Sequence, residues 1–264
     1  MDVAAISPQS LYDTAARPGA PLIIDVRREA AFAADDRMIV GAMRHRPEDA
    51  ALWAGALAPD RSIVVYCVHG HEVGQETAAA LRAAGRQAAY LAGGITAWTD
   101  AGLPTRRRDV GAAGPWVTRE RPKVDRIACP WLVRRFVDPT AQFIYVPAAE
   151  VGAVAERLGG TAYDIPGARF SHDGEACSFD AFIRIFGITD PALDHLARIV
   201  RGADTARPEL TPQSAGLLAL SVGLSTLCHD DHAMLECGMT VYDALYAWCR
   251  DGLAETHDWP PVQA

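Results

Sequence analysis

Residues 63–74 constrain the fold of this chain more than any other part of the sequence. They read Ile-Val-Val-Tyr-Cys-Val-His-Gly-His-Glu-Val-Gly. A continuous apolar run is typical of a strand buried inside a parallel sheet. Here the run ends at Cys67, and a helical pattern opens at about Gly74. Open α/β sheets bind ligands beyond the carboxyl ends of their strands. The sequence therefore predicts a ligand-binding loop that begins with a thiol.

Cys67 is placed to act as a nucleophile. Several backbone N–H groups at a turn between strand and helix point into one concavity and favour an anion. A thiol in such a field ionises more readily, and the thiolate is the nucleophilic form. The alternative is a buried, unreactive cysteine at the end of a strand. Position alone leaves both interpretations open.

The size and charge of the chain limit its number of domains and the kinds of partner it can bind. At 264 residues it is longer than one typical domain, so we expect two. Its net charge of −8 argues against a nucleic-acid-binding surface. It contains no run of about 18 apolar residues that could span a membrane, and its first residues lack the basic region of a signal peptide. The six cysteines form no Cys-x-x-Cys pair, which favours reduced thiols and a cytoplasmic location.

Strand and helix patterns alternate through residues 1–104. We expect strands at 22–26, 39–40, 63–66 and 87–91, and helices at 7–16, 29–34, 47–57, 75–84 and 95–101. Ser7 is available to cap the first of these helices. Repeated units of this length predict an α/β domain built on a doubly wound parallel sheet.

Three motifs in this region resemble the rhodanese family. They are Asp25-Val26-Arg27 followed by Phe32 and Gly41-Ala42, then Tyr66-Cys67-x-x-Gly70, and finally Leu91-Ala92-Gly93-Gly94-Ile95-x-Ala97-Trp98 continuing to Pro104. The resemblance covers about the first 104 residues. It implies a sulfurtransferase in which Cys67 accepts a sulfane sulfur as a persulfide and passes it to a thiophilic acceptor.

The resemblance also implies the binding loop and the partners. The loop around the persulfide would comprise Val68, His69, Gly70, His71, Glu72 and Val73. The partners would be small-molecule or thiol donors and acceptors of sulfur, and the domain would need no cofactor.

Glu72 departs from the family pattern. Many members carry Arg, Lys, Ser or Thr in the positions after the loop glycine, whereas this chain has His71-Glu72-Val73. A carboxylate beside a thiolate repels an anionic donor such as thiosulfate. We therefore expect persulfide chemistry with a different donor if Glu72 faces the thiol. His69 and His71 either offset this charge when protonated or are ordinary polar loop residues.

A short basic segment follows the first domain. Residues 105–114 have the composition of a linker, and residues 104–136 hold nine Lys or Arg against three Asp or Glu. Such a run is usually a solvated face. Guanidinium groups also match tetrahedral oxyanions, so Arg126, Arg134 and Arg135 are candidate oxyanion contacts.

Residues 115–254 begin as an α/β pattern and then become mostly helical, and 255–264 form a loose tail. We expect strands at 116–118, 143–146 and 162–165, and helices at 124–137 with an interruption at Pro130, 150–158, 178–186, 193–201, 212–227 and 231–250. Ser178 is the expected cap of the helix that it begins.

Four stretches of this second domain resemble the C-terminal domain of the ChrB-type chromate-resistance family. They are residues 116–136, Cys177-Ser-Phe-Asp, residues 199–204 and residues 242–249. In that family the domain often follows a different N-terminal domain linked to transcriptional regulation. A rhodanese in its place favours an enzyme over a regulator.

Two segments of the second domain offer metal ligands. His232 and Glu236 have the i, i+4 spacing of helical metal sites, and His229 would join them if the helix includes it. His172 and Glu175, on a glycine-containing loop, could complete a mixed N/O site for a divalent cation. The alternative is that Asp230 or Asp231 caps the helix and the histidines are solvated or core residues.

The favoured function is therefore sulfur transfer through Cys67, with the second domain choosing or sensing the partner. Two alternatives belong to other classes: a chromate- or oxyanion-responsive binding protein without turnover, and a metal-dependent enzyme centred on the second domain. We expect neither nucleic acid nor a membrane as a partner.

Overall fold

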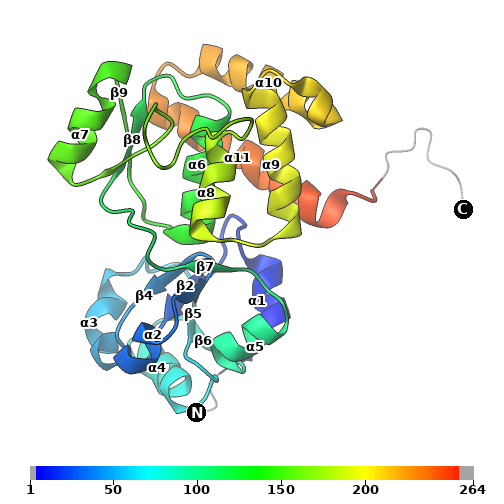
Figure 1. Ribbon diagram of the computed structural model, residues 1–264. Helices are drawn as coiled ribbons and strands as arrows, with labels where there is room; N and C mark the ends of the chain where they lie inside the picture. Colours follow the sequence, from blue (N-terminus) through cyan, green and yellow to red (C-terminus); the bar gives the residue numbers. More distant parts are fainter. Residues whose placement is uncertain (1–3, 256–264) are drawn as a thin grey trace, which may run out of the picture.

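The computed structural model describes residues 4–255 and shows two α/β parts, one above the other in Figure 1. The first part has a parallel five-stranded sheet in the order β1-β6-β5-β2-β4. Its strands are β1 (Ala5–Ile6), β2 (Leu22–Asp25), β4 (Ala42–Arg44), β5 (Ile63–Tyr66) and β6 (Ala88–Leu91). Its helical segments are α1 (Pro8–Thr14), α2 (Glu29–Ala33), η1 (Pro47–Asp49), α3 (Ala50–Trp53), η2 (Ala54–Ala56), α4 (Glu72–Ala83) and α5 (Gly94–Asp100). The predicted α/β class and parallel sheet are confirmed.

Alternation along the strands produces a separate core on each face of this sheet. Val64 and Tyr66 point toward α1 and α5, whereas Val65 and Cys67 lie on the face covered by α3 and α4. Successive side chains of a strand point to opposite faces, so a strand buried on both faces must be apolar throughout. That requirement explains the uninterrupted apolar run of β5.

The expected linker begins as a strand. Residues of β7 (Thr105–Arg107) pair antiparallel with β3 (Arg37–Ile39). The first three residues of the 105–114 segment are therefore anchored to the first part. Strands β1, β4 and β7 were absent from the predicted set because two or three residues are too few to show a period of two.

The second part has a small parallel sheet and a large helical half. The strands lie in the order β10-β8-β9, with bounds β8 (Trp116–Arg119), β9 (Phe143–Val146) and β10 (Thr161–Ala162). One face is covered by α7 (Val151–Leu158) after the short η4 (Ala148–Glu150). The other face carries α6 (Asp125–Leu132), η3 (Val133–Val137), α8 (Ser178–Phe186), α9 (Pro191–Asp204), η5 (Pro208–Leu210), α10 (Pro212–Leu227), α11 (Asp231–Ala247) and η6 (Trp248–Gly252).

Helix α6 passes through Pro130 without ending, contrary to the expected interruption. Proline has no N–H for the carbonyl four residues earlier, which here belongs to Arg126. The Tyr163 hydroxyl donates to that carbonyl oxygen at 3.4 Å. The helix then continues into the π-helical turn η3.

The cap of α8 differs from the prediction, whereas that of α11 is one of the two residues named from the sequence. Cys177, and not Ser178, is the N-cap of α8, and its N–H donates to the Asp180 carboxylate at 2.9 Å. Asp230 caps α11 by accepting from the Ala233 N–H at 2.8 Å. His229 therefore lies outside the helix. The expected tail falls outside the described residues, apart from Glu255.

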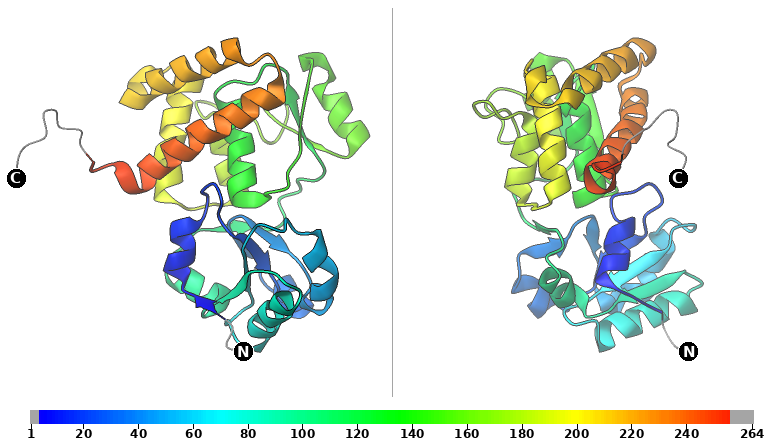
Figure 2. Two further views of the ribbon diagram at one scale, coloured as in Figure 1. Left: turned by 180° about the vertical axis from the view of Figure 1, so that it is seen from behind. Right: turned by 90° about the vertical axis from the view of Figure 1, so that its right-hand side faces the viewer.

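The second part lies against the amino edge of the first sheet, as the two views in Figure 2 show. Gly41, just before β4, donates from its N–H to the Phe136 carbonyl at 2.6 Å. The Arg250 guanidinium donates to the carbonyls of Tyr12 and Ala15, where α1 ends, at 3.2 and 3.4 Å. Cys67 follows the carboxyl end of β5, so its loop opens on the opposite edge.

No helix within residues 4–255 is both long enough and apolar enough to cross a bilayer.

Candidate functional site

Cys67 lies between the end of β5 and the start of α4, as its position in the sequence predicts. Its side chain is 6% exposed. Helix α4 begins at Glu72, three residues before the expected start at residue 75. Gly74 is therefore inside the first turn, and a Cβ atom built there would lie 3.4 Å from the Cys67 Sγ atom. The positive end of a helix dipole thus approaches the thiol.

The Cys67 loop is fastened to the start of α5. The N–H groups of Ile95 and Thr96 donate to the carbonyls of Cys67 and Val68 at 3.0 and 3.1 Å. A Cβ atom at Gly94 would lie 2.4 Å from the Cys67 carbonyl oxygen, and Gly94 has φ +60°. Only glycine permits this approach of two backbones. The Gly93-Gly94 pair, in the last of the three rhodanese-like motifs, therefore determines the shape of the loop that holds the thiol.

The loop leaves backbone donors free. Residues 68–71 lie outside helix and strand, and among the described residues their N–H groups donate to no acceptor. His69 Nδ1 is 3.2 Å from Thr96 Oγ1. His69, His71 and Glu72 are all exposed. Free N–H groups next to a thiol in the sequence are the kind of donors that an anion-binding loop requires.

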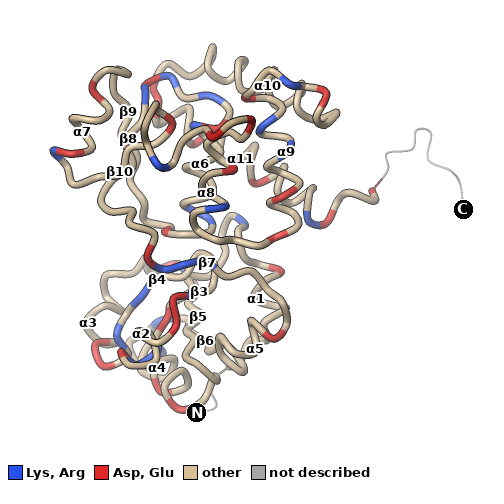
Figure 3. The backbone as a smooth tube through the Cα atoms, in the orientation of Figure 1, with Lys and Arg blue, Asp and Glu red and all other residues tan. Residues whose placement is uncertain are grey.

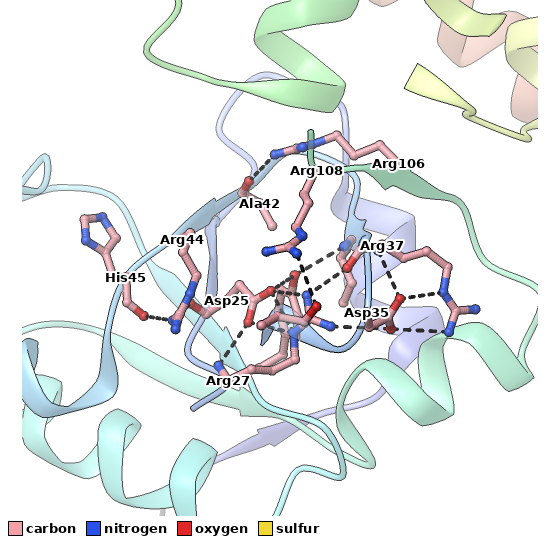
Figure 4. A network of polar contacts seen from close by, with 12 residues as sticks. Asp25, Arg27, Asp35, Arg37, Ala42, Arg44, His45, Arg106 and Arg108 are labelled. Carbon is pink, nitrogen blue, oxygen red and sulfur yellow. Dashed lines mark hydrogen bonds and ion pairs between the residues drawn. The ribbon is translucent and has the colours of Figure 1, made fainter. Parts of the chain in front are cut away.

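A buried ionic network supports the strand end beneath Cys67. The Arg27 Nη2 atom is 2.7 Å from Asp25 Oδ2, with side chains 1% and 0% exposed. The Tyr66 hydroxyl donates to the same oxygen at 2.9 Å, and burial raises the pKa of this phenol well above its usual value. Figure 4 shows Arg27 also reaching toward Asp35. The Asp25-Val26-Arg27 motif therefore fixes the position of the residue before Cys67.

The three arginines expected to contact an oxyanion are each engaged by a carboxylate. Arg126 Nε is 3.3 Å from Asp164 Oδ2, Arg134 Nη1 is 2.6 Å from Glu236 Oε1, and Arg135 Nε is 2.8 Å from Asp243 Oδ1. Arg134 and Arg135 line one cavity, but Arg126 does not, and each of the three has a different carboxylate partner, so the three do not form one open cationic site.

The expected metal ligands do not come together. Glu175 pairs with Arg207 at 2.9 Å and Glu236 pairs with Arg134. His232 lies edge-on to Tyr145, with ring centroids 5.5 Å apart. Within the described residues, the group of His, Cys, Asp or Glu side chains that could hold an ion contains His172 but none of the other three. The set proposed from the sequence is corrected accordingly.

His172 instead meets three aspartates. Its Nε2 atom lies 3.2 Å from Asp125 Oδ2, 3.3 Å from Asp164 Oδ1 and 3.2 Å from Asp204 Oδ2. The carboxylates come from the start of α6, the segment after β10 and the end of α9. Asp125 and Asp164 are 3% exposed and Asp204 15%, whereas His172 is 41% exposed and closes the cluster on the solvent side.

The charges in this cluster are only partly balanced. Arg119 and Arg126 both contact Asp164. The hydrogen bond with Asp125 raises the pKa of His172. Burial and the charge of Asp125 raise the pKa of Asp204.

The backbone beside the cluster is strained. Val124, immediately before Asp125, has φ 40°, and Asp164 has φ 53°. Such conformations are uncommon outside glycine and cluster at functional sites. Asp125 and Asp204 also lie within two of the segments on which the family resemblance rests, residues 116–136 and 199–204, and this was the signal that could have identified them.

Comparisons with known proteins match each of the two parts to a protein family. Residues 7–101 match the family described as Rhodanese-like domain, and residues 116–249 match the family described as ChrB, C-terminal domain. Protein ChrB from Cupriavidus metallidurans is 33% identical over 132 residues, which are 50% of this chain and 39% of ChrB. The match thus spans well under half the length of that relative.

Similar solved structures align with the first part. A rhodanese-related protein from Thermoplasma volcanium is 22% identical, covers 39% of this chain and 96% of its own, and has a TM-score of 0.34. A full-length protein from Lactobacillus plantarum is 30% identical, covering 39% and 87%, with a TM-score of 0.36. A rhodanese-like domain from Anabaena is 31% identical, covering 40% and 79%, with a TM-score of 0.33.

With half of its residues in the second match, the chain belongs to the ChrB C-terminal domain family and carries a rhodanese-like domain in front of that domain.

Proposed function

We propose that this protein is a sulfurtransferase that carries sulfane sulfur on Cys67. One observation supports this most directly: the thiol stands at the start of a loop whose N–H groups at residues 68–71 have no acceptor among the described residues. Such donors stabilise both a thiolate and the terminal sulfur anion of a persulfide. The six cysteines are free, consistent with the reducing cytoplasm expected from the sequence.

The reaction has two displacement steps. The Cys67 thiolate attacks the outer sulfur of the donor, so a Cys67 S–S bond forms and the donor leaves as a thiolate or sulfite-type anion. A nucleophilic acceptor then attacks the terminal sulfur of the persulfide, takes it, and releases the Cys67 thiolate. No outside oxidant or reductant is needed.

The test is intact-mass analysis after incubation with a low-molecular-weight persulfide, followed by transfer to cyanide. Wild type should gain one sulfur atom and then lose it to the acceptor. Cys67→Ser should do neither and should melt at the wild-type temperature, because the hydroxyl is similar in volume but forms no anion at neutral pH.

Cys237→Ser is the matched control, because Cys237 is an exposed thiol far from the loop in sequence. This variant should keep full turnover. Turnover that survives in Cys67→Ser, or that disappears in Cys237→Ser, would refute the proposal.

A second candidate function rests on the His172 cluster: we propose that it binds a divalent cation through Asp125, Asp164, Asp204 and His172. The ligand atoms of Asp125, Asp164 and His172 lie within 4.8 Å of one another, a spacing that one ion at about 2.1–2.3 Å from each can satisfy. The Nε2 atom of His172 can donate only one hydrogen bond, yet three carboxylate oxygens lie within 3.3 Å of it. One hydrogen bond therefore cannot satisfy all three carboxylates. Three carboxylates and one imidazole suit a hard or borderline ion such as Mn²⁺ or Fe²⁺.

Metal analysis and melting with added Mn²⁺ test this candidate. Mn²⁺ should raise the melting temperature of wild type by mass action on the folded state. His172→Gln should remove that rise, and its folding should be normal because the side chain is partly exposed. Glu175→Gln, three residues away and paired only with Arg207 among the described residues, should behave as wild type. Equal responses of all three proteins would leave the cluster as a structural network.

A further inference from the structure

We propose that a cavity between the two parts binds a small organic anion whose acid group is held by Arg106 and Arg108. The cavity has a volume of about 640 Å³, within the range of small-molecule sites. Phe32 and Arg44 of the first part line it, as do Trp116 and Phe186 of the second. Cys67 and its loop do not contribute to this lining, so the inference goes beyond the proposed sulfur transfer.

Arg106 is a buried cation without a counterion. Its side chain is 7% exposed. Its guanidinium donates to the carbonyls of Arg107 and Ala42 at 3.2 and 3.0 Å, and its Nε has no partner. No described carboxylate lies within ion-pair distance of it. Burying an unpaired charge is costly, and burial lowers the pKa of this group. An anion in the cavity would remove that cost.

Arg108 adds a second set of donors on the same side. In an extended chain residues 106 and 108 face one way and 107 the other, and Arg107 is indeed exposed while Arg106 is buried. The Arg108 guanidinium donates only to the Ala33 carbonyl, at 3.3 Å, among the described residues. Each guanidinium carries five N–H groups, so most of those on Arg106 and Arg108 have no protein acceptor. Figure 3 shows basic residues along β7 at this boundary.

The Phe32 ring holds the Arg44 and Arg108 side chains in position. The Cζ atoms of Arg44 and Arg108 each lie 4.5 Å from the centre of its ring. Cation–π contacts of this kind hold guanidinium groups in place while leaving their N–H edges free. The donors are therefore positioned before a ligand arrives.

The two acidic residues of the lining form no ion pair with Arg106 or Arg108, although the charge of Asp138 acts on Arg106. Asp109 accepts from the Gly111 N–H at 3.0 Å. Asp138 accepts from the N–H and hydroxyl of Thr140 at 2.8 and 2.6 Å. Both carboxylates are engaged in local turns. Three arginines (Arg44, Arg106 and Arg108) against these two aspartates leave the lining with an excess of one positive charge, which favours an anion.

The remaining lining selects an apolar body. Met38, Met43, Trp116, Val137 and Phe186 contribute to the cavity walls. An inorganic oxyanion would fill only a small part of this volume and leave the space along these apolar side chains unfilled. A ligand with one acid group and an aromatic or aliphatic body satisfies both halves of the lining.

Fluorescence titration with two matched probes tests the proposal. The first is 8-anilinonaphthalene-1-sulfonate, and the second is N-phenyl-1-naphthylamine, which has the same ring system without the acid group. Wild type should bind one equivalent of the sulfonate at least tenfold more tightly than the amine. Arg106→Met and Arg108→Met should each weaken sulfonate binding about tenfold and leave amine binding unchanged, since each loses charge-assisted hydrogen bonds.

Arg107→Met is the matched control on the same strand and should bind both probes as wild type does. Cys67→Ser should also bind normally, so failure of the sulfur-transfer proposal would not affect this result. Arg108→Met, whose side chain is only partly buried, keeps the test valid if Arg106→Met does not fold. Equal affinity of wild type for the two probes, or equal effects of the changes at 106, 107 and 108, would overturn the proposal.

Discussion

Glu72 occupies the first turn of α4, five residues after Cys67, and its side chain is exposed. A carboxylate in this place favours its own helix end but also repels an anion that approaches the thiol. Because Glu72 is exposed to water, the repulsion is modest, at most about 1 kcal/mol. Under the proposed sulfur transfer, this charge would bias the choice of donor without preventing turnover.

Glu72→Gln should raise kcat/KM for thiosulfate about twofold at low ionic strength and leave it unchanged at high salt, where the charge is screened. The measurement is a steady-state assay with cyanide as acceptor at both salt concentrations. Glu76→Gln, one turn further along α4 and also exposed, is the control and should have a smaller effect. Equal effects of the two changes would show that only net charge matters.

The residues of the candidate sites were predictable only where one segment holds them. Cys67 and its loop follow from a single strand-to-helix transition, and the structure places them there. His172 was identified, but its partners were not. Spacing along a helix shows which residues share that helix face, such as His232 and Glu236. Asp125, Asp164 and Asp204 meet His172 from three separate segments, and no spacing in the sequence encodes that meeting.

Among the elements, the start of α5 has the tightest contact with the Cys67 loop. A Cβ atom at Gly94 would lie 2.4 Å from the Cys67 carbonyl and 2.5 Å from that of Val68. Gly94→Ala should therefore destabilise the protein by about 2–3 kcal/mol, from strain and from overlap with backbone that cannot move freely. It should also reduce sulfur transfer, because the loop must shift. Urea unfolding and the transfer assay measure the two effects.

Gly85→Ala provides the comparison. Gly85 has φ +80°, yet nothing lies within 4 Å of a Cβ atom there. This change should cost only about 1 kcal/mol of backbone strain and should leave the transfer rate unchanged. Similar losses in the two variants would mean that overlap at Gly94 is relieved by local movement.

The length of each helix or strand decided whether the sequence pattern predicted it. The four-residue strand β5 and the helices α8 and α10 have the predicted bounds. Strands β1, β4 and β7, of two or three residues, escaped prediction because they depend on pairing, as β7 does with β3. The passage of α6 through Pro130 depends on the Tyr163 hydroxyl, which lies far along the chain. Contacts of this kind belong to the tertiary structure.

In the whole molecule, Arg250 joins the two parts. Its side chain is 8% exposed and donates to three carbonyls at the end of α1, including that of Asp13 at 3.2 Å. Its Cζ lies 5.4 Å from the centre of the Tyr12 ring and 5.7 Å from that of Tyr246. One side chain thus contacts α1 of the first part and α11 of the second.

Arg250→Met should weaken this contact by about 2–3 kcal/mol, since it removes several charge-assisted hydrogen bonds. In calorimetry, wild type should unfold in one transition and the variant in two. Arg184→Met is the control, because Arg184 is 62% exposed and pairs with the exposed Asp173. A single unshifted transition in Arg250→Met would show that other contacts hold the parts together.

The docking of the second part on the amino edge of the sheet also determines where sulfur can go. The other five cysteines, Cys129, Cys177, Cys228, Cys237 and Cys249, all belong to the second part, which lies at the edge of the first sheet opposite Cys67. Under the proposed sulfur transfer, a persulfide on Cys67 would therefore have no neighbouring cysteine of the same chain, and its sulfur would be delivered in collisions with other molecules. The rate of sulfur delivery would then rise in proportion to the concentration of the acceptor, and the sulfur atom would leave at the same edge of the sheet at which it arrived.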